Sequence, residues 1–462
     1  MPADSRIGPA GRLRATLRRI TGAEGRLSSL FRGSALVMAT QIAGIGLAYA
    51  MQVAVARWAG AFEFGLFAYA WTWMNLIFLV AAFGLNESAL RLIPLYSSHA
   101  QWGKLRGLVI RGPAVVFGLA TLAGLAGAGA LLILGDRVGE PYRLPLLLTF
   151  AASPLFGLLA FFQGIGRALG GVMTAFLPRY IGMPAIVLTA VGAIVLSGGV
   201  PDATRLIEIT IGAGALLVLV QGVLLLRDLP AEAKGISSVA PTAEWMRLSL
   251  PLLFIAVCFG LLTHCDLLLV GALLSAEEVA LYQAASRTAA LVSFPLFALN
   301  ALVAPMIARL HAEGRIAELQ RSVSLATQMV FWPSLIGALL AVAGGRYILG
   351  IFGPAFTAAH LALGILIVGH LVNVAVGPVS YLMTMTGNQH RCAGIWAATV
   401  VLQVALDLIL IPRWGIEGAA IGTACATTFL GLALTILVKR RLDISAHAFV
   451  PVWRTLSRAV RI

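Results

Sequence analysis

Apolar segments recur along the whole chain at a length that suits a lipid bilayer, with short polar breaks between them. A hydrocarbon core about 30 Å thick needs roughly 20 helical residues to cross it. The pattern predicts an all-α integral membrane protein with about twelve transmembrane helices. The predicted spans are residues 34–56, 64–84, 112–134, 144–166, 175–197, 205–226, 248–270, 284–305, 322–344, 356–380, 392–411 and 416–438.

The composition agrees with this class, because 60% of the residues are hydrophobic and 11% are charged, against roughly 25% charged in soluble domains. The net charge of +14 does not indicate nucleic acid as a partner, since the basic residues lie at the ends of apolar segments and do not cluster on one face. The four cysteines all fall within apolar segments. We expect them to be small core residues, with neither disulfides nor a metal site.

The basic residues also predict the orientation of the chain. With a cytoplasmic N-terminus, most of the 33 Lys and Arg residues fall on the cytoplasmic side, as the positive-inside rule requires. Both termini are then cytoplasmic, and no secretory signal peptide is expected. Segment 1–33 is predicted to be a basic tail that either lies on anionic membrane lipid or is disordered, and segment 439–462 a basic amphipathic tail.

The longest polar break divides the chain into two halves. Residues 227–247 are predicted to form a cytoplasmic linker between an N-lobe, 34–226, and a C-lobe, 248–438. An internal repeat supports the division, because residues 61–70 resemble residues 276–285. Two like halves in the same orientation imply a pseudo-twofold axis along the membrane normal, and transporters of this kind bind substrate near the midplane between the halves.

Four ionisable side chains within the predicted spans are candidates for function, because a charge is costly there. Asp266 follows His264 by two residues in the seventh span, and weaker candidates are Asp407 and His370. They are candidates to carry a proton or sodium ion that drives transport, with no other cofactor expected. For Asp266 the alternative is a hydrogen bond to a neighbouring helix or a ladder with Arg287. The consecutive His264-Cys265-Asp266 points in three directions around a helix, which disfavours a metal site.

The sequence lacks the features that are typical of two other classes of membrane protein. An ATP-driven transporter needs Gly-Lys followed by Ser or Thr, but Leu105 follows the only Gly-Lys pair. Glycosyltransferases and polysaccharide ligases of the membrane usually carry catalytic groups in a sizeable external loop, and the predicted outside loops are short. We therefore expect no enzymatic activity.

Several short motifs resemble those of polysaccharide-biosynthesis membrane proteins, which are flippases for lipid-linked oligosaccharides. This family lies within the larger MATE-like exporter (MOP) superfamily. The resemblance covers both halves in the expected order, and it is carried by Val55 to Ala70, Gly84 to Arg91 with Pro94, Asp266 with Glu278 to Tyr282, Ala304 to Ala308, Met385 to Gly387, and Ile411 to Gly422.

The resemblance implies two six-helix bundles facing each other in a V. It also implies an activity, the transfer of undecaprenyl-diphosphate-linked oligosaccharide from the cytoplasmic to the periplasmic leaflet of the bacterial inner membrane. A polysaccharide polymerase or other assembly proteins are the possible protein partners. A MATE-type cation-coupled drug antiporter is the runner-up, disfavoured because few acidic residues lie within the spans. A non-transporting scaffold for polysaccharide assembly stays open.

A diphosphate needs cationic donors, and arginine binds its oxygens through a planar fork. The candidates are Arg179, with a membrane-anchor alternative, and Arg287, with a helix-end salt bridge to Glu277 or Glu278 as the alternative. The family motifs also include Arg57, Arg91 and Glu87, for which gating or fold roles are predicted. Glu87 and Arg91 are four residues apart, so an ion pair within one helix is expected.

Overall fold

The computed structural model describes residues 9–134, 139–444 and 446–449, and for residues 9–37 it describes the backbone alone. These residues form helices and connecting turns. The first half contains α1 (Pro9–Val80), α2 (Leu85–Ser98), α3 (Trp102–Leu134), α4 (Glu140–Ala151), α5 (Ser153–Ala168), α6 (Val172–Leu177), the π-helical turn η2 (Pro178–Gly182), α7 (Met183–Leu196) and α8 (Ala203–Asp228).

The second half begins after a linker that holds the 3-10 turn η3 (Ala231–Ala233). It contains α9 (Thr242–Leu273), α10 (Ala276–Ala290), η4 (Leu291–Ser293), α11 (Phe294–Ala312), α12 (Ile316–Ala343), α13 (Gly345–Gly350), η5 (Pro354–Ala359), α14 (His360–Val376), α15 (Val379–Met385) and α16 (Gln389–Leu442). Most of the predicted C-terminal tail lies outside the described residues.

Eight of the described helices are long and apolar enough to cross a membrane, and a ninth span is counted if the bent pair α4–α5 is one crossing. Two of the eight contain a sharp turn at a single glycine with positive φ, Gly60 in α1 and Gly415 in α16. Glycine adopts this conformation because it has no Cβ. The polar breaks predicted near these glycines are therefore single-residue turns that join two helical arms.

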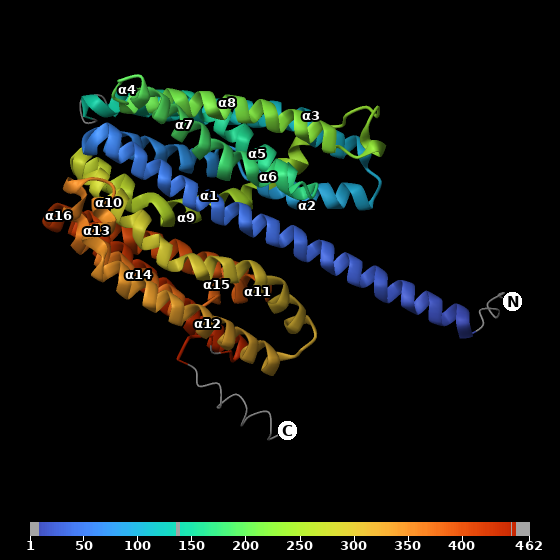
Figure 1. The fold of residues 1–462 in the computed structure, drawn as a ribbon. Helices are drawn as coiled ribbons and strands as arrows, with labels where there is room; N and C mark the ends of the chain where they lie inside the picture. The colour runs from blue at the N-terminus through green and yellow to red at the C-terminus, as the bar shows by residue number, and fades with distance from the viewer. Residues whose placement is uncertain (1–8, 135–138, 445, 450–462) are drawn as a thin grey trace.

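The N-terminal segment is helical from Pro9 onward and continues without a break into the first predicted span. Residues 1–8 lie outside the described residues. Figure 1 shows α1 extending away from the bundles toward its N-terminal end, while its later part runs between them. The segment predicted as an N-terminal tail is thus an extension of α1 over the described part.

The linker packs along the beginning of α3. The backbone N–H of Val239 donates to the Gly103 carbonyl at 2.9 Å, and Arg106 donates to the Ile236 carbonyl at 2.5 Å. A Cβ on Gly107 would lie 1.8 Å from the Val239 carbonyl oxygen. Because α9 already begins at Thr242, the last part of the predicted linker belongs to a helix.

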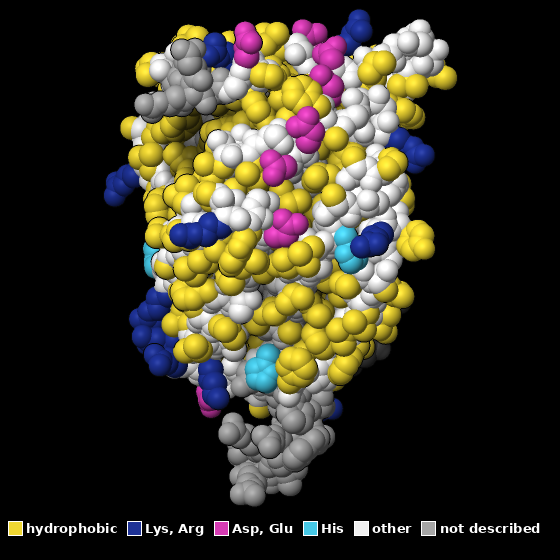
Figure 2. All heavy atoms as spheres, turned by 90° about the vertical axis from the view of Figure 1, so that its left-hand side faces the viewer, with side chains coloured by type: hydrophobic (Ala, Val, Ile, Leu, Met, Phe, Trp, Pro, Cys, Tyr) yellow, Lys and Arg dark blue, Asp and Glu magenta, His cyan; other side chains and the backbone are white. Residues whose placement is uncertain are grey.

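The two bundles meet at the end where α1, α10, α13 and α16 come together and separate toward the N-terminal end of α1 (Figure 1). We name this contact region the closed end. Tyr49 lies 5.5 Å from Phe352 between ring centroids, and Phe64 lies 5.9 Å from Phe356. Figure 2 looks onto this end and shows acidic side chains from its centre toward the first lobe, with basic side chains mostly toward its sides.

The internal repeat lies at the closed end, where its two copies pack against each other. Gly65 of the first copy lies so close to the start of α10 that a Cβ would come within 1.7 Å of the Ala276 carbonyl oxygen in the second copy. One turn apart along the same interface, Gln283 donates to Gln52 at 2.8 Å and Tyr49 bonds Thr288 at 3.0 Å. Contact between the two repeats fits the predicted pseudo-twofold relation of the halves.

Replacing Gly65 by alanine should destabilise the protein, because the added methyl group must push α1 and α10 apart at a cost of about 1–3 kcal/mol. We expect a lower melting temperature of the purified protein in detergent. Gly46 in the same helix has nothing within 4 Å of a built Cβ, so Gly46→Ala serves as the control and should leave the melting temperature unchanged or higher. Equal melting temperatures for the two variants would contradict this packing.

Candidate functional site

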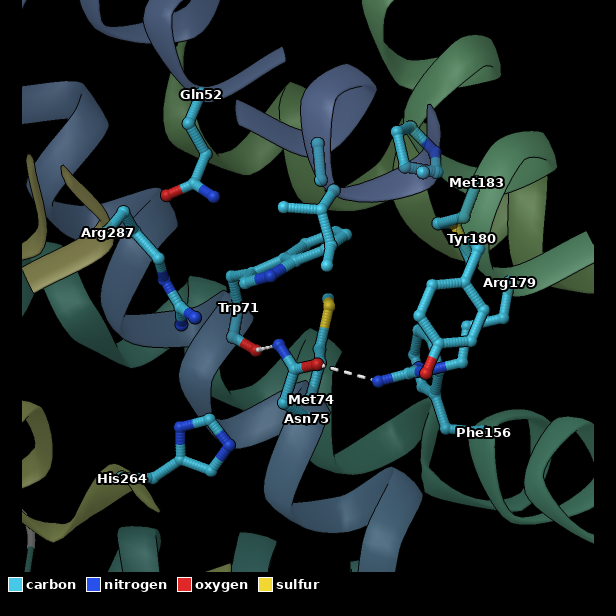
Figure 3. Close-up of a pocket in the computed structure, with 14 residues that line it drawn as sticks. Gln52, Trp71, Met74, Asn75, Phe156, Arg179, Tyr180, Met183, His264 and Arg287 are labelled. Atoms are coloured by element: carbon cyan, nitrogen blue, oxygen red, sulfur yellow. Dashed lines mark hydrogen bonds between the residues drawn. The ribbon is translucent and has the colours of Figure 1, made fainter. Parts of the chain in front are cut away.

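A cavity of about 240 Å³ lies between the lobes and receives side chains from both. Both arms of α1 line it, together with α5, η2 and α7 of the first half and α9 and α10 of the second. Its charged side chains are Arg179 and Arg287, and its other titratable side chains are His264 and Tyr180 (Figure 3). The two predicted diphosphate ligands, 108 positions apart in sequence (287 − 179 = 108), are thus brought into one pocket.

Arg179 enters the cavity from the π-helical turn η2. Such turns insert an extra residue into a helix, re-aim the side chains that follow and occur frequently at functional sites. The Arg179 guanidinium donates to the Asn75 side-chain oxygen at 2.8 Å and lies over the Phe78 ring, 3.5 Å from its centroid. The side chain is therefore held inside the protein, which argues against the membrane-anchor alternative.

Arg287 reaches the cavity from the opposite lobe, and Figure 3 shows its guanidinium pointing into the same space as Gln52 and His264. Its Nε atom is buried and has no hydrogen-bond partner among the described residues. The expected alternative, a salt bridge to Glu277 or Glu278, is not formed. Glu278 instead completes a capping box with Ser275 at the start of α10, nine residues before Arg287.

The cavity has a positive electrostatic character. None of the described residues that line it is Asp or Glu, whereas two are arginine. A guanidinium inside an apolar protein is costly unless an anion or hydrogen-bond acceptors compensate its charge. The pocket is therefore suited to an anionic group that accepts several hydrogen bonds, such as a phosphate or diphosphate.

A second polar centre lies inside the C-lobe. The Tyr282 hydroxyl donates to the Asp266 carboxylate at 2.7 Å, and the Thr423 hydroxyl donates to the same oxygen at 3.2 Å. Gln403 in turn donates to Thr423 at 3.2 Å. Asp266 thus accepts the expected hydrogen bond with a neighbouring helix. It lies apart from His264, which lines the central cavity.

Asp407 belongs to the same buried region. Its side chain is fully buried, and neither carboxylate oxygen has a hydrogen-bond partner among the described residues. A Cβ on Gly422 would come within 2.0 Å of one of these oxygens, so the glycine leaves the space that the carboxylate occupies. A buried carboxylate without donors is stabilised by taking up a proton or a cation.

The remaining predicted residues lie elsewhere. His370 bonds the Ser293 hydroxyl at 3.0 Å within the C-lobe. Arg57 lies near the closed end and donates to the Ile351 carbonyl at 3.4 Å. The expected Glu87–Arg91 pair is wrong: Glu87 pairs with Arg167 at 3.1 Å, because the end of α5 packs beside the start of α2, and Arg91 is exposed.

Sequence reasoning missed the neutral polar residues of the cavity, which are Gln52, Trp71, Asn75 and Tyr180. Gln52 and Asn75 lie inside predicted apolar spans. A polar side chain within such a span needs an internal partner, and this signal was available. It does not say which helix supplies the partner.

The two helical bundles and the central cavity between them form a fold that is similar to that of MATE family transporters. A multidrug resistance MATE family transporter in an inward-facing conformation aligns with TM-score 0.71 and 14% identity, covering 86% of this chain and 94% of that one. The lipid II flippase MurJ, inward closed, aligns with TM-score 0.68 and 15% identity, covering 92% and 90%. A MOP superfamily transporter from Pyrococcus furiosus, described as having a binding pocket of reverse polarity, aligns with TM-score 0.62 and 13% identity, covering 89% and 95%.

The chain belongs to the polysaccharide biosynthesis protein family, whose model matches residues 30–311, and the MatE model matches residues 251–409. The resemblance predicted from the motifs is thereby confirmed. The probable flippase AglR of Haloferax volcanii is 27% identical over 194 residues, which is 40% of this chain and 39% of that relative. The match thus spans about two fifths of the curated relative.

The Tyr282 hydroxyl should contribute measurably to stability, because hydrogen bonds to a charged group contribute about 1.5–3 kcal/mol. We expect Tyr282→Phe to lower the melting temperature of the purified protein. Tyr49→Phe is the control, since Tyr49 bonds the neutral Thr288 hydroxyl and its removal costs about 0.5–1.5 kcal/mol. A Tyr282→Phe effect no larger than the control would indicate that Asp266 is uncharged in the resting protein.

Proposed function

We propose that the protein is a flippase that moves undecaprenyl-diphosphate-linked oligosaccharide from the cytoplasmic to the periplasmic leaflet of the bacterial inner membrane by alternating access. The main support for this function is the central cavity, into which Arg179 and Arg287 project from opposite lobes. Its described lining has no acidic residue. The membership of the polysaccharide biosynthesis protein family supports the same conclusion.

The chemistry of such a substrate fits the cavity. A charged group at the bilayer centre costs at least several kcal/mol, and two arginines offset this cost by binding the diphosphate oxygens. The cavity of about 240 Å³ is smaller than the roughly 300–1,000 Å³ of pockets that enclose drug-sized ligands. It therefore suits the diphosphate linkage, while the glycan extends toward the side where the lobes separate.

The MATE-type cation-coupled drug antiporter is the competing function. Its organic cations would meet two guanidinium groups and no carboxylate in the described cavity lining, which is an unfavourable electrostatic environment. The similarity to multidrug transporters concerns the fold, since those structures share about 14% identity with this chain. The charge of the cavity favours the flippase.

The proposed topology has twelve crossings with both termini in the cytoplasm. The 61-residue apolar stretch Met38–Ser98 is too long for a single crossing at 1.5 Å per residue. It contains α2 and the part of α1 that Gly60 divides into two arms. Gly415 divides α16 in the same way. In this topology the closed end faces the periplasm, and Arg57, Glu87 and Arg91 are assigned to the moving ends of the lobes.

Asp266 and Asp407 are the proposed coupling site for a proton or sodium ion. An ion bound there would neutralise the buried carboxylates and shift the packing of α9, α10 and α16, which Asp266 joins through Tyr282 and Thr423. Arg287 lies on α10 five residues after Tyr282, so the two centres share one helix. His264 and His370 are assigned lesser roles in the same cycle. Assembly proteins of the polysaccharide pathway and anionic lipid are the proposed partners.

Arg179→Ala and Arg287→Ala should each weaken binding of undecaprenyl diphosphate by roughly 10- to 100-fold, because each removes charge-assisted hydrogen bonds. Equilibrium binding to the purified protein in nanodiscs measures this effect. The control is Arg413→Ala, since Arg413 is exposed on α16 and bonds its own helix. Unchanged affinity in both pocket variants would place the diphosphate elsewhere.

Cells that lack the protein should accumulate lipid-linked glycan in the cytoplasmic leaflet and lose the corresponding surface polysaccharide. Lipid analysis of such cells tests the function itself. Normal surface polysaccharide together with altered tolerance to cationic drugs would reject the flippase and favour the antiporter.

Asp407→Asn should abolish the dependence of transport on a proton or sodium gradient while leaving substrate binding intact, because the amide cannot exchange a proton or neutralise a cation. Flipping in proteoliposomes with each gradient imposed in turn measures this. Asp202→Asn is the control, since Asp202 caps α8 and asparagine caps a helix equally well. Retained gradient dependence in Asp407→Asn would remove Asp407 from the coupling site.

A further inference from the structure

Asn75 is fixed in one orientation by its two hydrogen bonds. Its side-chain nitrogen donates to the Trp71 carbonyl at 2.7 Å, one turn earlier in α1, and its side-chain oxygen accepts from Arg179 at 2.8 Å. An amide has one donor end and one acceptor end. Because the carbonyl of Trp71 requires the donor end, the acceptor end must face Arg179.

Phe78 covers the flat face of the same guanidinium. The Arg179 Cζ atom lies 3.5 Å from the ring centroid, within the range of a cation–π contact. Phe78 follows Asn75 by three positions, so both side chains project from one face of α1. Asn75 thus holds one edge of the guanidinium, and Phe78 holds one face. Among the described residues, the guanidinium donates no other hydrogen bond.

Both partners of Arg179 are electrically neutral, in contrast to those of the basic residues that form salt bridges. Arg167 pairs with Glu87, Lys104 with Glu244, and Arg315 with Glu313. These pairs are partly exposed to the surroundings. A carboxylate at position 75 would hold Arg179 at least as firmly, but it would also cancel the charge that an anionic ligand requires.

We infer that Asn75 and Phe78 are positioning residues for anion recognition, which hold Arg179 in place without neutralising it. The inference rests on the proposed diphosphate function of the cavity. The inference states that the uncharged side chain of residue 75 determines how strongly the cavity binds a diphosphate. A hydrogen bond to Arg179 alone is not sufficient.

The test compares Asn75→Asp with Asn75→Ala in the full-length protein in nanodiscs, with inorganic pyrophosphate as the probe. Asn75→Ala frees Arg179 and should weaken pyrophosphate binding about tenfold. Asn75→Asp should weaken it further, about a hundredfold, while the melting temperature stays the same or rises because a salt bridge forms. A purely structural role would move affinity and melting temperature in the same direction. Phe78→Leu should weaken binding about threefold.

The chain offers a matched control in Asn388. Its side chain also donates to a backbone carbonyl, that of Thr386, and accepts from an arginine, Arg391, at 3.2 Å, but it lies outside the cavity. Asn388→Asp should leave pyrophosphate affinity unchanged. Equal losses in Asn388→Asp and Asn75→Asp, or no loss in Asn75→Asp, would overturn the inference alone. Absence of pyrophosphate binding by the unaltered protein would overturn the proposed function as well.

Discussion

The cost of holding a charge inside an apolar protein governs the arrangement of this molecule. Most of its surface must face hydrocarbon, so any interior charge needs compensation from the protein or from a ligand. The described interior contains two such places, a basic cavity between the lobes and a pair of carboxylates inside the C-lobe. Each is built from helices that belong to different parts of the chain, which makes charge compensation sensitive to how the helices are placed.

The two centres are compensated in different ways. Arg179 has neutral partners and Arg287 has a buried nitrogen without any among the described residues, so the cavity keeps its positive charge. Asp266 is bonded by two hydroxyl groups, whereas Asp407 has no donor among the described residues. The helix α10 contributes Arg287 to one centre and Tyr282 to the other. A change of charge at either centre therefore acts on the same rigid element, which is the physical requirement for coupling two sites.

Much of the fold could be predicted because a bilayer restricts a chain to apolar helices. The apolar segments and the internal repeat predicted two helical halves that are related by a pseudo-twofold axis. Arg179 and Arg287 could be proposed because a charge inside an apolar span is conspicuous. Asn75 could not be assigned, since its partner lies 104 positions away and an uncharged amide does not show which helix it meets. The Glu87–Arg91 expectation failed because spacing describes neighbours within one helix, whereas Arg167 comes from another.

The single-glycine turns in α1 and α16 constrain how this chain can change in length. Each turn joins two long helical arms through one residue with positive φ, Gly60 or Gly415. One extra residue in a helical arm rotates everything beyond it by about 100°, and a turn of this size has no spare chain to absorb the rotation. Insertions close to these glycines would direct Phe64 or Thr423 away from their partners. Tolerated differences in length should therefore lie away from these two glycines.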